Sequence, residues 1–292
     1  MSRYFTNRLA KYAVFISASV SFIVLLAIAV FIFRDGLPAF QEIGILDFLF
    51  GNVWRPSLEK YGILVMVVGS LQVTVGALLL AVPLGIACAI LLAEVAPPRV
   101  RQVLRPAVEL LVGIPSVVYG LVGMVLLLPA VREYFGGNGA SVLAASIVLT
   151  AMVLPTIISI SEDSIRAVPV TYKEGALALG ATRWQTIWRV LIPAARSGIG
   201  ASIVLGMGRA IGETMAMIMV IGNCIKFAET PLDCTRTLTG NIAVEIGYAA
   251  GTHRSALFAT GIVLLIFILL INSIAVITLK RGVKGVSGQN LA

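Results

Sequence analysis

Residues 255–279 read SALFATGIVLLIFILLINSIAVITL, and this stretch decides the fold class. It contains no charged residue and lies between Arg254 and Lys280. Crossing a bilayer as an α-helix takes about 20 apolar residues, so the stretch is long enough to span a membrane. Its backbone must be helical, because lipid offers no hydrogen-bond partner to N–H and C=O groups. We therefore expect a membrane helix here.

Further stretches of the same character make the chain an all-α membrane protein with six spans. The composition agrees, because 59% of the residues are hydrophobic and 12% charged, whereas soluble domains are about 45–50% apolar and about 25% charged. An ordinary soluble, disordered or fibrous protein is excluded. The other predicted spans are residues 12–33, 61–93, 110–131, 134–161 with its helix starting near Ser141, and about 198–222. The second of these exceeds one crossing, so we expect part of it to lie along the surface or to enter tilted.

Lysines and arginines are distributed unevenly over the segments between the spans. The N-terminus, residues 94–109, residues 162–197 and the C-terminal tail together hold 14 of the 22. The segments 34–60, 132–140 and 223–254 hold 7, and Arg209 lies within a span. The positive-inside rule therefore predicts that both termini are cytoplasmic. Topology explains the net charge of +8, and no nucleic-acid partner is needed.

Several catalytic and nucleotide-binding motifs are missing from the sequence. No Gly-Lys dipeptide occurs, so a P-loop is excluded, and the single histidine, His253, excludes a zinc motif of the HExxH type. We expect no cofactor or metal in this chain and no catalytic residue. Cys224 and Cys234 both fall in a predicted external loop, where a disulfide is plausible, although the spacing alone does not decide the geometry.

The predicted cytoplasmic segment 162–197 is unusually long for a connection between two spans. Within it, residues 171–179 favour a helix that Gly180 can end in a left-handed cap. Thr182 and Gln185 have the spacing of a capping box for a second helix. Pro193 either ends this second helix or opens the next one. The pattern predicts two short helices on the inner membrane face. On the residues alone, they form an amphipathic surface hairpin.

This segment resembles the EAA loop of ABC importer permeases, whose pattern is E-A-A-x3-G-x9-I-x-L-P. Glu174, Ala176, Gly180 and Pro193 match in register, and Gly175 replaces the first alanine of the pair. The resemblance implies a coupling helix that docks on a cytoplasmic ATPase dimer, with Mg-ATP bound by that partner. Trp184, in the second helix, would face the interface or the partner.

Other stretches resemble phosphate importer permeases, and among them the PstC-type subunit. They are residues 92–98 (LAEVAPP), 109–120 (ELLVGIPSVVYG), 208–216 (GRAIGETMA) and 246–249 (IGYA). The resemblance implies a six-helix, MetI-like permease in a bacterial inner membrane, embedded in membrane lipid. It also implies a second, PstA-type permease and an external phosphate-binding protein. Residues 1–60 would form an N-terminal helix and external segment, 61–280 the permease domain with coupling loop 162–197, and 281–292 a cytoplasmic tail.

Arg209 and Glu213 are the charged residues within a predicted span. At positions i and i+4 they would share a helical face and could pair. A charge at this depth is a functional-site hypothesis by default, and a guanidinium suits the oxygens of phosphate. Arg209, Glu213, the adjoining Thr214 and, beside a proline, Ser116 are therefore pathway candidates. The alternative is a structural ion pair that locks two helices.

Small residues recur at fourfold spacing in the same predicted span as Arg209. This pattern allows close helix packing, either within the chain or against the second permease. They are Gly198, Ser202, Gly206 and Ala210.

Other functions stay open at this stage. A permease for another oxyanion, such as molybdate, tungstate or sulfate, would have the same composition. An ATP-independent secondary transporter or channel is a further alternative, although no inverted repeat is evident. A signalling scaffold that reports phosphate status could coexist with transport.

Overall fold

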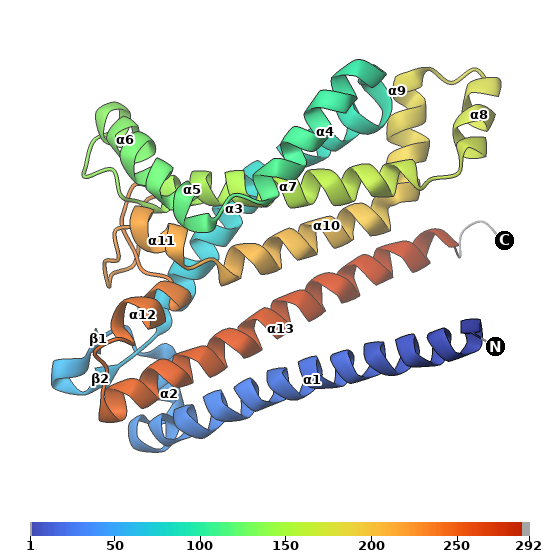
Figure 1. Cartoon of the computed structure of the whole chain (residues 1–292). Coiled ribbons are helices and arrows are strands. Elements are labelled where there is room, and N and C mark those ends of the chain that lie inside the picture. Colours follow the sequence, from blue (N-terminus) through green and yellow to red (C-terminus); the bar gives the residue numbers. More distant parts are fainter. Residues whose placement is uncertain (1, 288–292) are drawn as a thin grey trace.

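A computed structural model describes the backbone of residues 2–287 and the side chains of Arg8 and residues 10–277. Within this part of the chain, six helices are long and apolar enough to cross a membrane, which confirms the predicted number. In Figure 1, the start of α1 and the end of α13 lie at the same end of the bundle as α8. The side chains of the predicted tail, residues 281–292, lie outside the described residues.

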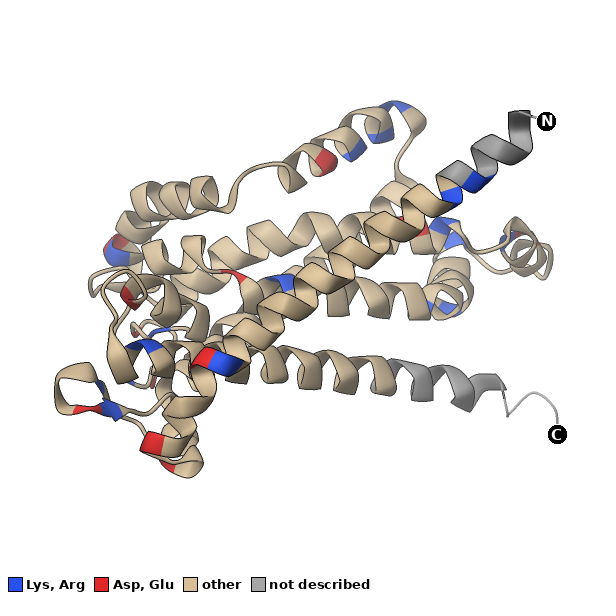
Figure 2. Cartoon of the chain, turned by 60° about the horizontal axis from the view of Figure 1, so that its bottom comes forward, with Lys and Arg blue, Asp and Glu red and all other residues tan. Residues whose placement is uncertain are grey.

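The six spans are assembled from helices of different length. They are Ala10–Ile43 of α1 (Ser2–Ile43), α3 with η2 (Leu64–Ile90 and Leu91–Val95), α5, η3 and α6 (Ser116–Val122, Gly123–Leu127 and Leu128–Phe135), α7 (Val142–Arg166), α9, η4 and α10 (Arg183–Thr186, Ile187–Leu191 and Ile192–Gly212), and Gly251–Ile277 of α13 (Gly251–Ser287). Figure 2 shows charged residues mainly toward the two ends of the bundle, with long uncharged stretches between them.

The remaining elements lie between the spans. They are α2 (Ile45–Phe50), the antiparallel pair β1 (Trp54–Arg55) and β2 (Lys60–Tyr61) around the 3-10 turn η1 (Pro56–Leu58), α4 (Pro98–Val112), α8 (Val170–Ala178), α11 (Met215–Val220) and α12 (Leu238–Glu245). Trp54 pairs with Tyr61 and Arg55 with Lys60 in the two-stranded sheet.

Three predicted boundaries are wrong, because the chain breaks or continues where hydropathy does not show it. The third span does not start at residue 110: α4 reaches Val112, residues 113–115 form a break, and Ser116 begins α5. The span predicted at 198–222 ends as a helix at Gly212, with Glu213 in extended conformation. That span also starts well before residue 198, because α9 continues through η4 into α10, where Pro193 lies in the first turn. The long stretch predicted at 61–93 is a single helical run from Leu64 to Val95, preceded by β2. Ser141 caps α7 as predicted, accepting a hydrogen bond from the Ala144 amide.

Each π-helical segment ends shortly before a proline. Proline lacks an N–H and its ring clashes with the carbonyl four residues back, so a helix before it must widen or bend. A single π-helical turn provides this widening. In it, the residue directly before the proline donates its hydrogen bond to the carbonyl five residues back. The donor and acceptor pairs are Ala96 with Leu91, Leu128 with Gly123, and Ile192 with Ile187, before Pro97, Pro129 and Pro193.

Helix α7 forms the centre of the bundle and packs against α3 and α10. Its buried residues include Leu149, Met152 and Val153, which join the small side chains of Ala77 and Ala81 from α3 in one cluster. Alanines and glycines on α3 let the two helices approach closely, as is common between membrane helices.

The small-residue ridge of α10 faces α7 rather than another subunit. A Cβ on Gly198 would lie 2.1 Å from the Ser164 Oγ, and one on Gly206 would lie 2.8 Å from Val153 Cγ1. The Ser202 and Ser161 hydroxyls are 2.8 Å apart in the same buried interface. The ridge therefore packs within the chain.

Gly206→Val should destabilise the bundle, because the added side chain overlaps Val153 and Ile157. Overpacking of this kind typically costs about 1–3 kcal/mol. The thermal midpoint of detergent-solubilised protein measures the effect. Gly247→Val is the matched control, since no atom lies within 4 Å of a Cβ there. Equal midpoints for the two variants would contradict the packing described here.

Candidate functional site

The coupling loop joins α8 to α9 through a glycine turn. Gly180 has φ +82°, the left-handed conformation that glycine adopts without strain. Thr182 then caps α9: its Oγ1 accepts from the Gln185 amide, and the Gln185 Oε1 accepts from the Thr182 amide. Both features of the predicted turn are therefore present.

The outer surface of this loop is apolar and uncovered. The Leu179 side chain is 91% exposed, and the indoles of Trp184 and Trp188 are each more than half exposed. Glu174, Gly175 and Pro193 are also exposed, and Ala176 is half-buried. Large apolar side chains gathered on an exposed surface are typical of a binding interface.

An ion pair joins α8 to the end of the second span. Lys173 Nζ contacts the Glu94 carboxylate, which belongs to η2. A cavity of about 410 Å³ lies beside this pair, between the two halves of the loop, and Leu177, Trp184 and Ile187 contribute to its lining. The coupling loop is thereby tied to α3 as well as to α10.

A buried carboxylate ties α4 to α7 close to the same loop. Glu162 is 1% exposed, and its Oε1 lies 3.0 Å from Arg166 Nε and 3.6 Å from Arg105 Nη1. Arg101 lies 3.9 Å from the same oxygen and donates to the carbonyls of Leu92 and Ala93. These carbonyls belong to η2, so one cluster holds α4, η2 and α7 together.

Two helix breaks are followed by segments that pack against each other. The first, residues 113–115, separates α4 from α5, and the second, Glu213 and Thr214, separates α10 from α11. The segments that follow them pack together, because a Cβ on Gly120 would lie 2.8 Å from Ala216 Cα. Broken helices at such a position are tolerated where they line a cavity or an ion path.

Each pathway candidate lies at one of these breaks or within one helical turn of it. Arg209 lies one turn before the end of α10 and is half-buried. Thr214 donates from Oγ1 to the Gly212 carbonyl, 3.2 Å away. Ser116 is half-buried as the first residue of α5, and it forms no hydrogen bond with the other three candidates among the described residues.

The predicted ion pair between Arg209 and Glu213 is not formed. Because α10 ends at Gly212, Glu213 does not share a helical face with Arg209. Its Oε1 instead accepts from the Ala216 amide at 3.2 Å. Within the described part of the chain, the Arg209 guanidinium has no hydrogen bond and no ion pair. A half-buried arginine of a membrane helix is thus left without a counter-charge.

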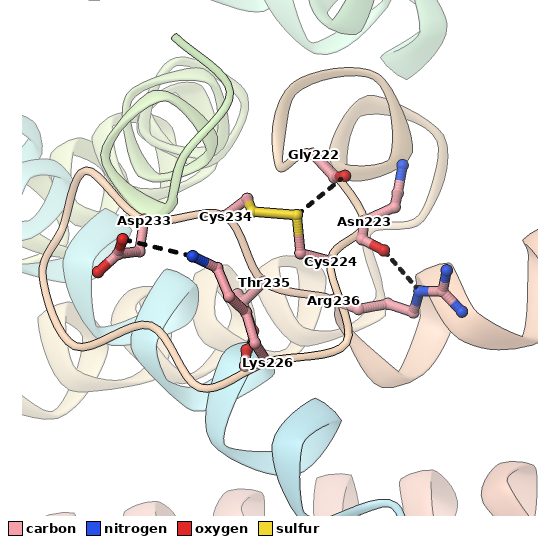
Figure 3. The surroundings of a disulfide bond; sticks show 8 residues. All are labelled: Gly222, Asn223, Cys224, Lys226, Asp233, Cys234, Thr235 and Arg236. Carbon is pink, nitrogen blue, oxygen red and sulfur yellow. Dashed lines mark hydrogen bonds and ion pairs between the residues drawn. A yellow bond between two sulfur atoms is a disulfide. The ribbon is translucent and has the colours of Figure 1, made fainter. Parts of the chain in front are cut away.

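Figure 3 shows the disulfide that the structure places between Cys224 and Cys234 in the loop after α11. Lys226 Nζ lies 3.7 Å from Asp233 Oδ1 across the same loop. Hydrogen bonds from the Thr230 amide and hydroxyl lower the pKa of Asp233, which keeps this carboxylate charged. Lys226 therefore faces a charged partner across the loop.

A second buried carboxylate joins elements at the end of the bundle opposite α8 (Figure 1). Glu245 accepts from Trp54 Nε1 at 2.8 Å and from Arg236 Nη1 at 2.6 Å, and the His253 ring nitrogen lies 2.8 Å from it. Sequence reasoning missed this group and Glu162. The available signal for Glu162 was its position directly after a predicted span, and Glu245 lies within the segment predicted between two spans. Neither position identifies the partners of the carboxylate.

Comparison with known proteins places this architecture in a family. A profile of the binding-protein-dependent transport system inner membrane component family matches residues 81–282. The chain belongs to this family. Its members include permease subunits of ABC importers, and six apolar helices make the chain a multi-pass membrane protein.

The permease is similar to several named permease sequences over most of its length. It is 46% identical to the probable ABC transporter permease protein YqgH of Bacillus subtilis, covering 84% of this chain and 83% of that one. It is 35% identical to the phosphate transport system permease protein PstC of Xylella fastidiosa, covering 91% and 87%. The probable PstC of Methanocaldococcus jannaschii is 34% identical, covering 92% of each chain.

Solved structures show the same fold. A chain of a bacterial alginate ABC transporter superposes with a TM-score of 0.64 at 19% identity, covering 90% of this permease and 91% of that chain. A chain of the inward-facing MetNI methionine transporter superposes with a TM-score of 0.61 at 20% identity, covering 79% and 99%. The predicted MetI-like importer-permease fold is confirmed.

Glu162→Gln should destabilise the permease, because it leaves three arginines around a buried neutral amide. Breaking a buried ion pair typically costs about 3–5 kcal/mol, and we expect less here because the three arginines are about one-third exposed. The thermal midpoint in detergent measures this. The neighbouring Asp163→Asn is the control, since Asp163 is 60% exposed and pairs with Arg105 alone. Similar shifts of the thermal midpoint for both variants would contradict the role of Glu162 in holding α4, η2 and α7 together.

Proposed function

We propose that this permease carries inorganic phosphate inward as one of two membrane subunits of an ATP-driven importer. The observation that carries the proposal is the unpaired, half-buried guanidinium of Arg209 at a helix break. A charge inside a membrane helix costs roughly 2.5–3.5 kcal/mol on insertion scales, so it persists where it meets an opposite charge. A tetrahedral oxyanion in transit supplies that charge, and the guanidinium fork matches its oxygens.

Phosphate is favoured over other oxyanions by the relatives. The PstC proteins of Xylella fastidiosa and Methanocaldococcus jannaschii are phosphate transport permeases by name, and the chain covers about nine-tenths of each. The GETMA sequence at the second break supports the same choice. Molybdate, tungstate and sulfate are the competing substrates that an uptake experiment must separate.

The proposed ATPase and binding-protein partners would bind at opposite ends of the bundle. The exposed Leu179, Trp184 and Trp188 fit the groove of a cytoplasmic ATPase dimer, which would bind and hydrolyse Mg-ATP. The outer segments around α2, β1, β2 and α12 would receive an external phosphate-binding protein. A PstA-type permease would complete the pathway. The start of α1 and the end of α13, which lie at the same end as α8 (Figure 1), would then be on the cytoplasmic side.

Arg209→Ala should abolish phosphate uptake while the transporter still assembles. Labelled phosphate at low external concentration, with and without tungstate or sulfate, measures uptake in cells that lack other phosphate importers. Co-purification of the ATPase subunit measures assembly. Arg196→Ala, which lies earlier on α10 and away from the second break, is the control. Loss of assembly in Arg209→Ala would favour a structural lock, and uptake blocked by the competitors would point to another oxyanion.

Replacing Leu179 and Trp184 by serine should uncouple the permease from the ATPase. These side chains are largely exposed, so the fold should stay intact while an apolar contact with the ATPase is lost. We expect reduced co-purification of the ATPase and reduced uptake, with an unchanged thermal midpoint of the isolated permease. Tyr134→Ser, an exposed aromatic residue on α6, is the control. Uptake that survives the double change would instead favour an ATP-independent carrier.

A further inference from the structure

The peptide between Glu213 and Thr214 is held from outside the two helices that it joins. The Glu213 carbonyl accepts a hydrogen bond of 2.9 Å from Thr239 Oγ1. Thr239 belongs to α12, on the external side, and is 7% exposed. Glu213 has ψ 131° and Thr214 has φ −121°, so the chain leaves the helical conformation at this bond.

The hydroxyl of Thr239 is itself directed by its neighbours. A hydroxyl has one proton, and Thr239 uses it on Glu213. In the 3.3 Å contact between the Thr237 and Thr239 hydroxyls, Thr237 is therefore the donor. Thr237 Oγ1 in turn accepts from the Gly240 amide at 3.1 Å. The bonds run in one direction, from the start of α12 to the Glu213 carbonyl, and chains of this kind strengthen one another.

The same region also holds the far end of α11. Asn223 Nδ2 donates to the Ile218 carbonyl at 2.7 Å, and the Arg236 Nε donates to the Asn223 carbonyl at 3.1 Å (Figure 3 shows the latter bond). Arg236 is fixed by Glu245 in α12. Both ends of α11 are thus bonded to α12 or to the residues directly before it, so α11 and α12 are held as one unit.

The break decides whether Arg209 has a carboxylate beside it. If α10 continued for one more residue, Glu213 would lie four positions after Arg209 on the same face, where such side chains pair. The Thr239 bond holds the Glu213 carbonyl away from the helical direction. The Glu213 carboxylate is then placed on the Ala216 amide, and Arg209 keeps its charge available.

We infer that Thr239 is a positioning residue for the anion pathway, which it keeps open by holding Glu213 out of α10. The inference rests on the proposed role of Arg209. Without the Thr239 hydroxyl, α10 gains its next residue, Glu213 pairs with Arg209, and the internal carboxylate competes with the transported anion.

The experiment compares Thr239→Val with Thr239→Ser in the complete transporter, expressed with its own partner subunits. Valine has nearly the shape of threonine and lacks the hydroxyl, whereas serine keeps it. We expect Thr239→Val to lower the maximal uptake of labelled phosphate per assembled complex about five- to tenfold, the range that loss of one hydrogen bond produces. Thr239→Ser should stay within about twofold of the wild type.

A second pair of variants separates positioning from a general structural role. In the Glu213→Gln background no carboxylate can neutralise Arg209, so adding Thr239→Val should lower uptake less than about twofold relative to Glu213→Gln alone. An equal loss in both backgrounds, or a serine variant as impaired as the valine variant, would overturn the inference.

A third readout does not depend on the substrate. Glu213→Gln should lower the thermal midpoint of the complex in the Thr239→Val protein, where the ion pair forms, more than in the wild type. Absence of this difference overturns the inference. Wild-type complex that takes up no phosphate would overturn the proposed substrate instead, and the midpoints would still decide the role of Thr239.

Discussion

A single arginine inside a membrane helix constrains much of this permease. Arg209 stands one turn before the end of α10, and among the described residues no carboxylate pairs with it. The nearest acidic residue in sequence, Glu213, is turned away by the end of the helix and bound to the Ala216 amide. The usual solution for a charge in lipid is a partner on a neighbouring turn or helix. Its absence supports the proposal that the second break is a site for an anion rather than a structural ion pair.

The two breaks are connected to opposite ends of the molecule. On one side, Arg101 and Arg105 tie α4 to η2 and to Glu162, and Lys173 ties the coupling helix to Glu94. On the other side, Thr239 and Arg236 tie α11 to α12 and to the buried carboxylate of Glu245. Movement of either end would therefore reach the breaks through bonded groups. Such connectivity is a physical route for coupling, and measured coupling energies must establish its use.

Much of the architecture could be predicted from local sequence. Uncharged stretches gave the number of spans, Ser141 and the Thr182–Gln185 box marked helix starts, and Gly180 marked the loop turn. The end of α10 at Gly212 could not be predicted, because the next residue, Glu213, is hydrogen-bonded by Thr239, which lies 26 positions after Glu213 in the chain. Periodicity therefore placed Arg209 and Glu213 on one face. The partners of Glu162 and Glu245 were missed for the same reason: they come from segments that only the tertiary fold brings together.

The most direct test of the central claim is a double-mutant cycle between Arg209 and Glu213. The thermal stability of the assembled complex is measured for Arg209→Gln, Glu213→Gln and the double variant. If Arg209 is unpaired, the two single effects add to within about 0.5 kcal/mol. A coupling energy above about 1 kcal/mol, with the double variant more stable than the single changes imply, would show that the two residues form an ion pair. That result would contradict the account of Arg209 as a charge kept free for the transported anion.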